Sequence, residues 1–79
     1  MSSFVETELN NLSKADINRE YIIKGVESED VELKNFLFTL GCYPGENVTV
    51  ISDFKHNFVI SVKDARYSID LDLAKAIKL

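Results

Sequence analysis

The stretch of residues 33–50 constrains the fold more than any other part of the chain, because a helical pattern changes there into a strand pattern. Apolar residues first recur at the spacing of one helix face: Leu33, Phe36, Leu37 and Leu40. Gly41 follows the last of them, and Pro44-Gly45 precede valines that alternate with polar residues. We therefore predict a core-packed helix over residues 31–40, closed by Gly41 at positive φ. A tight turn at Gly45 then leads into a strand.

The segment before this helix carries helix start signals. Ser28 is the predicted N-cap. The acidic residues at positions 29, 30 and 32 fill the first turn, where carboxylates interact favourably with the positive end of the helix dipole. This local role explains the acidic cluster without a cation site or a pair of catalytic carboxylates.

The other apolar residues alternate with polar ones in short runs, which is typical of strands. The predicted strands cover residues 20–26, 48–52, 58–62, 67–71 and 76–79. Residues 53–57 are the predicted connection of an antiparallel hairpin, and residues 70–75 form a helix-like turn. We predict a mainly β fold of about five antiparallel strands, with one helix after the first strand. Such strands are most economically closed as a small barrel, because closure removes exposed strand edges.

Length and charge limit the class of protein. The 79 residues have room for one domain, which we assign to residues 12–79; residues 1–11 are an N-terminal extension that forms a short helix or frays. A net charge of -4 without a basic run argues against nucleic acid and anionic membrane surfaces as partners. No signal-peptide pattern is present, and no apolar run approaches the ~20 residues of a spanning helix. We therefore expect a cytoplasmic protein without direct membrane insertion.

Few residues offer chemistry. Cys42 is the only cysteine and His56 the only histidine, and nothing in their spacing brings them together as a nucleophile and its base. His56 with Asp53 or Cys42 is an incomplete metal set, because an ordered site needs three or four converging ligands. No glycine-rich phosphate loop is present. We predict no catalytic residue, no cofactor and no resident metal, and we interpret Cys42 as a small apolar residue in the packing.

Two apolar residues of the predicted helix fall outside the core-facing stripe. Val31 and Phe38 lie on the opposite helical face, where they are either covered by the N-terminal Phe4, Val5 and Leu9 or contact a partner. The second alternative gives a candidate partner-binding set near the sharp corner that the chain makes from Gly41 to Gly45. Its members are Val31, Lys34, Phe38, Cys42, Tyr43 and Pro44. Lys34 would stand at the rim of this patch.

Several segments together resemble one known family. They are Leu40-Gly41-Cys42-Tyr43-Pro44-Gly45, the valine-rich run over residues 48–51, Ile60-Ser61-Val62, and the ending Ile69-Asp70-Leu71 with Ala74 and Ile77. In this combination the chain resembles the FeoA family, small cytoplasmic accessory proteins of bacterial ferrous iron uptake with an SH3-like barrel. Family members usually carry glycine in two turns in which this chain has Phe54-Lys55-His56-Asn57 and Lys63-Asp64-Ala65-Arg66.

The resemblance implies an interaction module that modulates a partner without turnover. That partner would be FeoB, the ferrous iron transporter with a cytosolic GTP-binding domain, and the resemblance implies neither transport nor GTP hydrolysis by this chain. An alternative from another class is a detached relative of the SH3-like C-terminal domain of iron-dependent transcriptional repressors. The sequence has no helix-turn-helix or basic surface that would favour this alternative.

Overall fold

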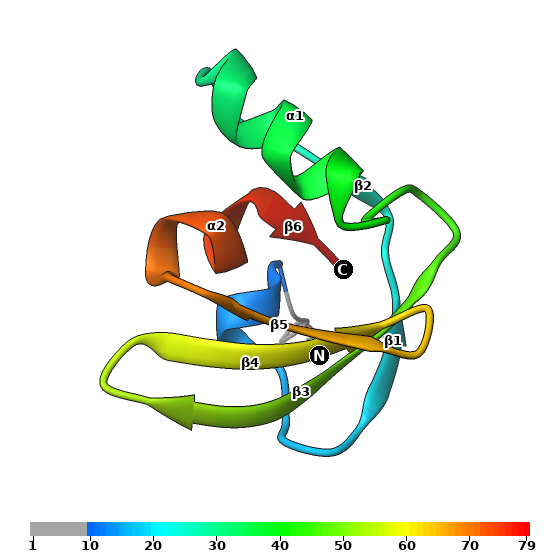
Figure 1. Ribbon diagram of the computed structural model, residues 1–79, viewed down its shortest axis with the longest axis vertical. Helices are drawn as coiled ribbons and strands as arrows, with labels where there is room; N and C mark the ends of the chain where they lie inside the picture. The colour runs from blue at the N-terminus through cyan, green and yellow to red at the C-terminus, as the bar shows by residue number, and fades with distance from the viewer. Residues whose placement is uncertain (1–9) are drawn as a thin grey trace, which may run out of the picture.

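The segments in which apolar and polar residues alternate form strands of two antiparallel sheets (Figure 1). The computed structural model describes residues 10–79. The larger sheet has the order β1-β3-β4-β5, with β1 at Glu20–Ile22, β3 at Asn47–Phe54, β4 at Asn57–Val62 and β5 at Ala65–Ile69. The smaller sheet pairs β2 (Gly25–Val26) with β6 (Ile77–Lys78). Helix α1 (Val31–Thr39) follows β2, and the short α2 (Leu71–Ala76) precedes β6. The predicted mainly β fold with a helix inserted early in the chain is confirmed.

One face of the larger sheet builds the core. Every second residue of β4 is buried, and valines of β3 lie on the same side. A 3-10 turn at Leu12–Lys14, α2 and β6 cover this face, while α1 projects away from it at the top of Figure 1. The most deeply buried large side chains are Leu12, Ile23, Leu37, Ile60, Ile77, Val48, Val50 and Val62. The prediction for the first eleven residues falls mostly on residues 1–9, outside the described residues.

The first predicted strand is in fact two strands. The sequence indicated one strand over residues 20–26, whereas β1 pairs with β3 and β2 pairs with β6. The pairing changes from the β3 side to the β6 side between two adjacent residues. The N–H of Ile23 donates to Glu46 O at 2.9 Å, whereas that of Lys24 donates to Lys78 O at 2.7 Å. This change carries the chain from one sheet to the other at a barrel corner. The prediction that the last strand returns to the first is confirmed.

Both hairpins of the larger sheet use two-residue turns. β3 and β4 pair up to Phe54 and Asn57, so the connection is shorter than the predicted residues 53–57. Lys55 and His56 have φ of 51° and 66°, and the β4–β5 turn repeats this geometry at positions 63 and 64 with φ of 53° and 66°. Positive φ at both central residues is the type I′ geometry that matches the strand twist. These are the two turns in which the family resemblance led us to expect glycine.

Helix α1 begins at Val31 as predicted, but its cap differs. The N-cap is Asp30, whose Oδ1 accepts the N–H groups of Glu32 and Leu33 at 3.0 and 3.2 Å. Ser28, the predicted cap, accepts the N–H of Asp30 instead. Asp30 directly precedes the first helical residue, two positions closer to the free N–H groups of the helix than Ser28.

The buried side of α1 is rotated relative to the predicted stripe. Leu37 is the only fully buried residue of the helix, with Leu33 and Phe38 packed partly against the core. Phe36, predicted to face inward, is 46% exposed. The reason is that this short helix lies at the rim of the barrel, where it contacts a narrow line of core residues and the neighbouring corner. The buried face of α1 therefore includes Phe38 and excludes Phe36.

Candidate partner-binding surface

The corner after α1 is fixed by a C-terminal cap. Gly41 has φ of +98°, and its N–H donates to Phe38 O at 3.0 Å, while the N–H of Cys42 donates to Leu37 O at 3.1 Å. These two bonds form a Schellman motif, in which a residue at positive φ closes the helix. The prediction for Gly41 is confirmed, and the chain leaves the helix in a direction that the backbone itself determines.

A second turn follows at once. The N–H of Glu46 donates to Tyr43 O at 3.0 Å, with Pro44 and Gly45 in the central positions and Gly45 at φ of +94°. Proline followed by a residue at positive φ is the signature of a type II turn. The N–H of Gly45 also donates to Ile23 O at 2.8 Å, which holds the turn against the first strands. The predicted tight turn at Gly45 is therefore present and anchored.

The two turns present an aromatic pair. The rings of Phe38 and Tyr43 are stacked with centroids 5.2 Å apart and an interplanar angle of 5°. Tyr43 is 48% exposed and Pro44 is exposed, whereas Phe38 is half-buried beneath the Tyr43 ring. We call Phe38, Tyr43 and Pro44 the corner surface. It offers a rigid apolar contact, because the two turns hold its backbone and the Phe38 ring holds the exposed Tyr43 ring in place.

The other predicted partner-binding residues lie around this surface in different environments. Val31 is 65% exposed at the start of α1, and Lys34 is half-buried on the same helix. Cys42 is fully buried, so its side chain supports the corner from the inside and offers no contact area to a partner. Phe36, which sequence reasoning assigned to the core, adds exposed apolar area on α1. Its exposure has no local sequence signal, because its spacing fits the inward stripe.

Cys42 is not an activated thiol. Burial raises the pKa of the Cys42 thiol from 9.0 to about 11, so the thiol is protonated at neutral pH. His56 lies in the β3–β4 turn, at the opposite end of β3 from the corner. Within residues 10–79 no group of three or more His, Cys, Asp or Glu side chains is arranged to hold a metal ion. The thiol acts here as an apolar side chain in the core.

This burial predicts a pH dependence of stability. The unfolded thiol loses its proton near pH 9.0 and the folded one near 11, so its contribution is fully present below pH 9 and is lost as pH rises toward 11. At pH ~10 the loss should be about 1.4 kcal/mol of unfolding free energy. We would compare urea unfolding of the wild type and Cys42→Ala at pH ~8 and ~10. The stability advantage of the wild type should shrink by that amount, and a constant advantage would contradict the buried thiol.

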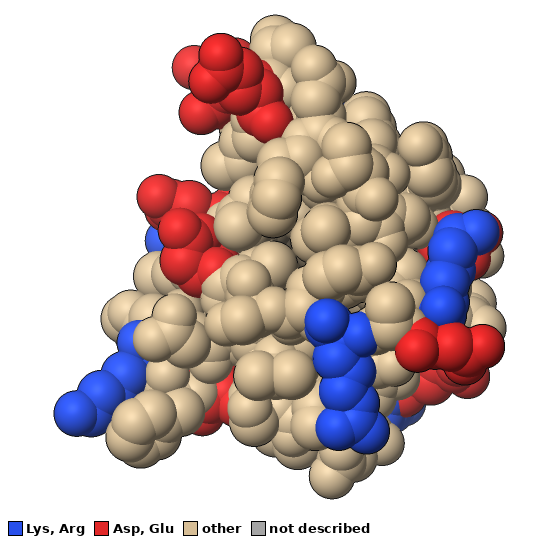
Figure 2. Space-filling model, in the orientation of Figure 1, with Lys and Arg blue, Asp and Glu red and all other residues tan. Residues whose placement is uncertain are grey.

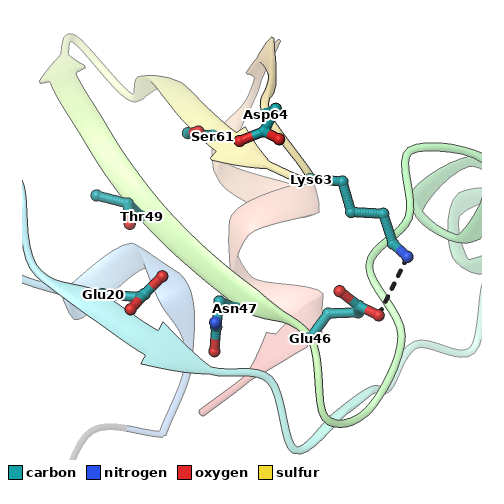
Figure 3. Close-up of a pocket in the computed structure, with 7 residues that line it drawn as sticks. All are labelled: Glu20, Glu46, Asn47, Thr49, Ser61, Lys63 and Asp64. Atoms are coloured by element: carbon teal, nitrogen blue, oxygen red, sulfur yellow. Dashed lines mark ion pairs between the residues drawn. The ribbon is translucent and has the colours of Figure 1, made fainter.

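A polar hollow of about 220 Å³ lies on the outer face of the larger sheet (Figure 3). Lys63 and Glu46 form an ion pair at 3.1 Å across its margin. The other lining residues are Glu20, Asn47, Thr49, Ser61 and Asp64. The Lys63 stem also lies against Gly41, where an added Cβ would be 3.1 Å from Lys63 Cδ, so the β4–β5 turn supports the corner. Sequence reasoning missed this hollow; the polar positions of alternate strand residues were its only signal.

Charge is unevenly distributed on the face of the molecule drawn in Figure 2. On the face drawn in Figure 2, acidic groups gather over the start of α1 and over α2, and most of the surface between them is uncharged. A protein contact is better suited to such an uncharged region than a phosphate backbone is, because nucleic acid binding depends on clustered Lys and Arg. Within residues 10–79 no helix is long and apolar enough to span a membrane.

Taken together, the two short antiparallel sheets and the inserted helix define a small SH3-like domain with an apolar corner. The model of the FeoA domain family matches residues 10–79, nearly the whole chain. The chain therefore belongs to the FeoA family, as the sequence motifs indicated. The comparison with curated protein sequences gives no significant match.

Solved structures confirm the fold. The FeoA of Stenotrophomonas maltophilia, described as an SH3 domain protein complexed with zinc, has a TM-score of 0.76 at 18% identity, covering 85% of each chain. A FeoA described as an iron uptake regulatory protein has a TM-score of 0.78 at 21% identity, covering 90% of this chain and 93% of its own. The IdeR protein of T. acidophilum has a TM-score of 0.77 at 20% identity, but only 35% of its chain is covered. At these identities the likeness concerns the fold alone.

Proposed function

We propose that this chain is a non-enzymatic accessory protein of ferrous iron uptake that docks on the cytosolic GTP-binding region of a FeoB-type transporter. It would act in the cytoplasm and be recruited to the inner face of the membrane by this partner. Family membership supports the process, and the relative from Stenotrophomonas maltophilia is described as a candidate activating factor of bacterial ferrous iron transport. Docking in a fixed stoichiometry would stabilise or gate the transporter.

The observation that carries the proposal is the exposed Tyr43 ring stacked on Phe38 beside Pro44. Aromatic side chains dominate the binding energy of protein interfaces, especially where they are held in one conformation before binding. The Schellman cap and the type II turn provide that preorganisation, since they fix the backbone on both sides of Tyr43. Val31, Phe36 and Lys34 on α1 would form the surrounding contacts.

Replacing Tyr43 with alanine should weaken binding to the purified GTP-binding domain by about thirtyfold, which corresponds to an interface hot spot of about 2 kcal/mol. The melting temperature should change little, because Tyr43 is largely on the surface. Phe54→Ala is the matched control, since Phe54 is an aromatic residue that is 68% exposed in β3, next to the β3–β4 turn. Calorimetry of both variants would decide, and equal affinities for them would contradict docking at the corner surface.

Phe38→Ala separates docking from packing. Phe38 supports the Tyr43 ring and packs against the core, so its truncation should lower both affinity and stability. If the N-terminal residues cover Phe38 in the absence of a partner, deletion of residues 1–9 should lower stability in the same way. Lowered stability with unchanged affinity would assign Phe38 to the core alone.

The second candidate function is that of a detached regulatory domain related to the iron-dependent repressors. It is favoured by the TM-scores of 0.77 and 0.79 to IdeR and to a manganese-dependent transcriptional repressor, of which this chain covers 35% and 39%. Affinity capture from cells with identification of the bound protein would distinguish the two candidates. A polytopic membrane protein with a GTP-binding domain would support the first, and a DNA-binding protein the second.

A further inference from the structure

The larger sheet ends in two strands, β1 on one side and β5 on the other. Each of them pairs with only one strand within residues 10–79. Figure 3 shows β1 (cyan) bordering the sheet beside β3. Unpaired strand edges are templates for another strand, so proteins usually cover or block them. The strand pairing determines which backbone groups point outward at the two edges.

The outer edge of β5 is formed by Arg66 and Ser68. The two-residue turn makes Val62 and Ala65 a hydrogen-bonded pair, so alternate residues of β5 bond to β4 and those between them point outward. The backbone groups of Arg66 and Ser68 have no other partner within residues 10–79. Among the described residues, the outward N–H and C=O of each therefore bond to no other backbone group.

The outer edge of β1 has the same arrangement. The N–H of Ile23 bonds to Glu46 O beside β3, so Tyr21, two residues earlier, also directs its backbone toward β3. Glu20 and Ile22 therefore point outward, again without another backbone partner within the described part of the chain. Ile22 is 57% exposed, so this edge also presents an apolar side chain.

The two edges are complementary in charge. Arg66 and Glu20 are both exposed, and neither forms an ion pair with another residue in the range 10–79. A β5 edge that paired with a second β5 edge in its best register would place Asp64 opposite Asp70, which like-charge repulsion opposes. Pairing of β5 with β1 brings opposite charges together instead.

We propose that copies of this chain associate head to tail, with the β5 edge of one copy paired antiparallel to the β1 edge of the next. Arg66 then stands opposite Ile22, and Ser68 opposite Glu20, which gives roughly four backbone hydrogen bonds. The side chain of Arg66 lies diagonal to Glu20 and covers Ile22 with its aliphatic stem. Because the two edges differ, the contact is heterologous and builds a ring or a short filament.

Two proline variants test the pairing. Ser68→Pro removes an outward N–H of β5 and Ile22→Pro one of β1, and neither N–H bonds within its own sheet, so both folds should survive. The controls Ser68→Ala and Ile22→Val keep the N–H, and thermal unfolding checks that every variant is folded. Sedimentation velocity from about 20 µM to about 1 mM should show association of the wild type and both controls.

The proline variants should each be monomeric and should form a one-to-one complex when mixed, because each retains the edge that the other lacks. Three results would overturn the proposal: a monomeric wild type at about 1 mM, no complex in the mixture, or self-association of Ile22→Pro alone. The last result would mean that two β5 edges pair with each other.

A charge exchange gives an independent test that does not depend on proline. Arg66→Glu and Glu20→Arg should each weaken association about fivefold, because each creates a like-charged pair at the contact. Both changes in one chain should restore association to within about twofold of the wild type. A double variant as weak as the single ones would show that these residues do not meet.

Discussion

Replacing Leu37 with alanine should lower the free energy of unfolding by about 3 kcal/mol, the largest effect that we expect from a single change in this protein. Leu37 is fully buried and is the main contact between α1 and the barrel. Its truncation leaves a cavity that the neighbouring backbone cannot fill, because the Schellman cap ties the Leu37 carbonyl to Cys42. Urea unfolding would measure the loss.

Phe36→Ala is the matched control on the same helix. Phe36 is 46% exposed, so we expect a change within about 0.5 kcal/mol although more atoms are removed. The inward stripe read from the sequence makes Phe36 and Leu37 equivalent. Equal losses of unfolding free energy for the two variants would therefore support the predicted stripe and contradict the observed rotation of α1.

Replacing Gly41 with valine should cost about 2 kcal/mol, because a β-branched residue is strongly disfavoured at φ of +98°. The new side chain would also displace the Lys63 stem, since an added Cβ would be 3.1 Å from Lys63 Cδ. Lys63 would then release Glu46, a minor loss for an exposed ion pair. The melting temperature should fall clearly.

Alanine variants divide this cost into its parts. Gly45→Ala places a Cβ at φ of +94° with no atom within 4 Å, so it measures backbone strain alone. Gly41→Ala adds the Lys63 contact to the same strain, and Gly25→Ala meets neither. We expect the loss of stability to decrease from Gly41 to Gly45 to Gly25. An unchanged melting temperature for Gly41→Ala and Gly41→Val would contradict the cap.

Much of the fold could be predicted because its signals are local. Gly41 and Pro44-Gly45 define the corner through their own backbone preferences, and the alternation in β3 and β4 fixes which face is buried. The motifs of this corner, combined with Ile60-Ser61-Val62 and the C-terminal pattern from Ile69 to Ile77, also indicated the FeoA family, which the family model confirms. The corner surface was predicted for the same reason, since Tyr43 and Pro44 belong to the turn itself. That it binds the transporter stays a prediction.

The sequence by itself thus determined the class of fold, the corner and the family, since each can be recognised from residue patterns within short segments. The tertiary structure decided which way α1 faces, that Cys42 packs inside and offers no contact area to a partner, and where the first strand changes its partner strand. It also decided that β1 and β5 end the sheet with complementary edges. These features depend on contacts between distant segments, and side-chain spacing along one segment carries no information about the segment that packs against it.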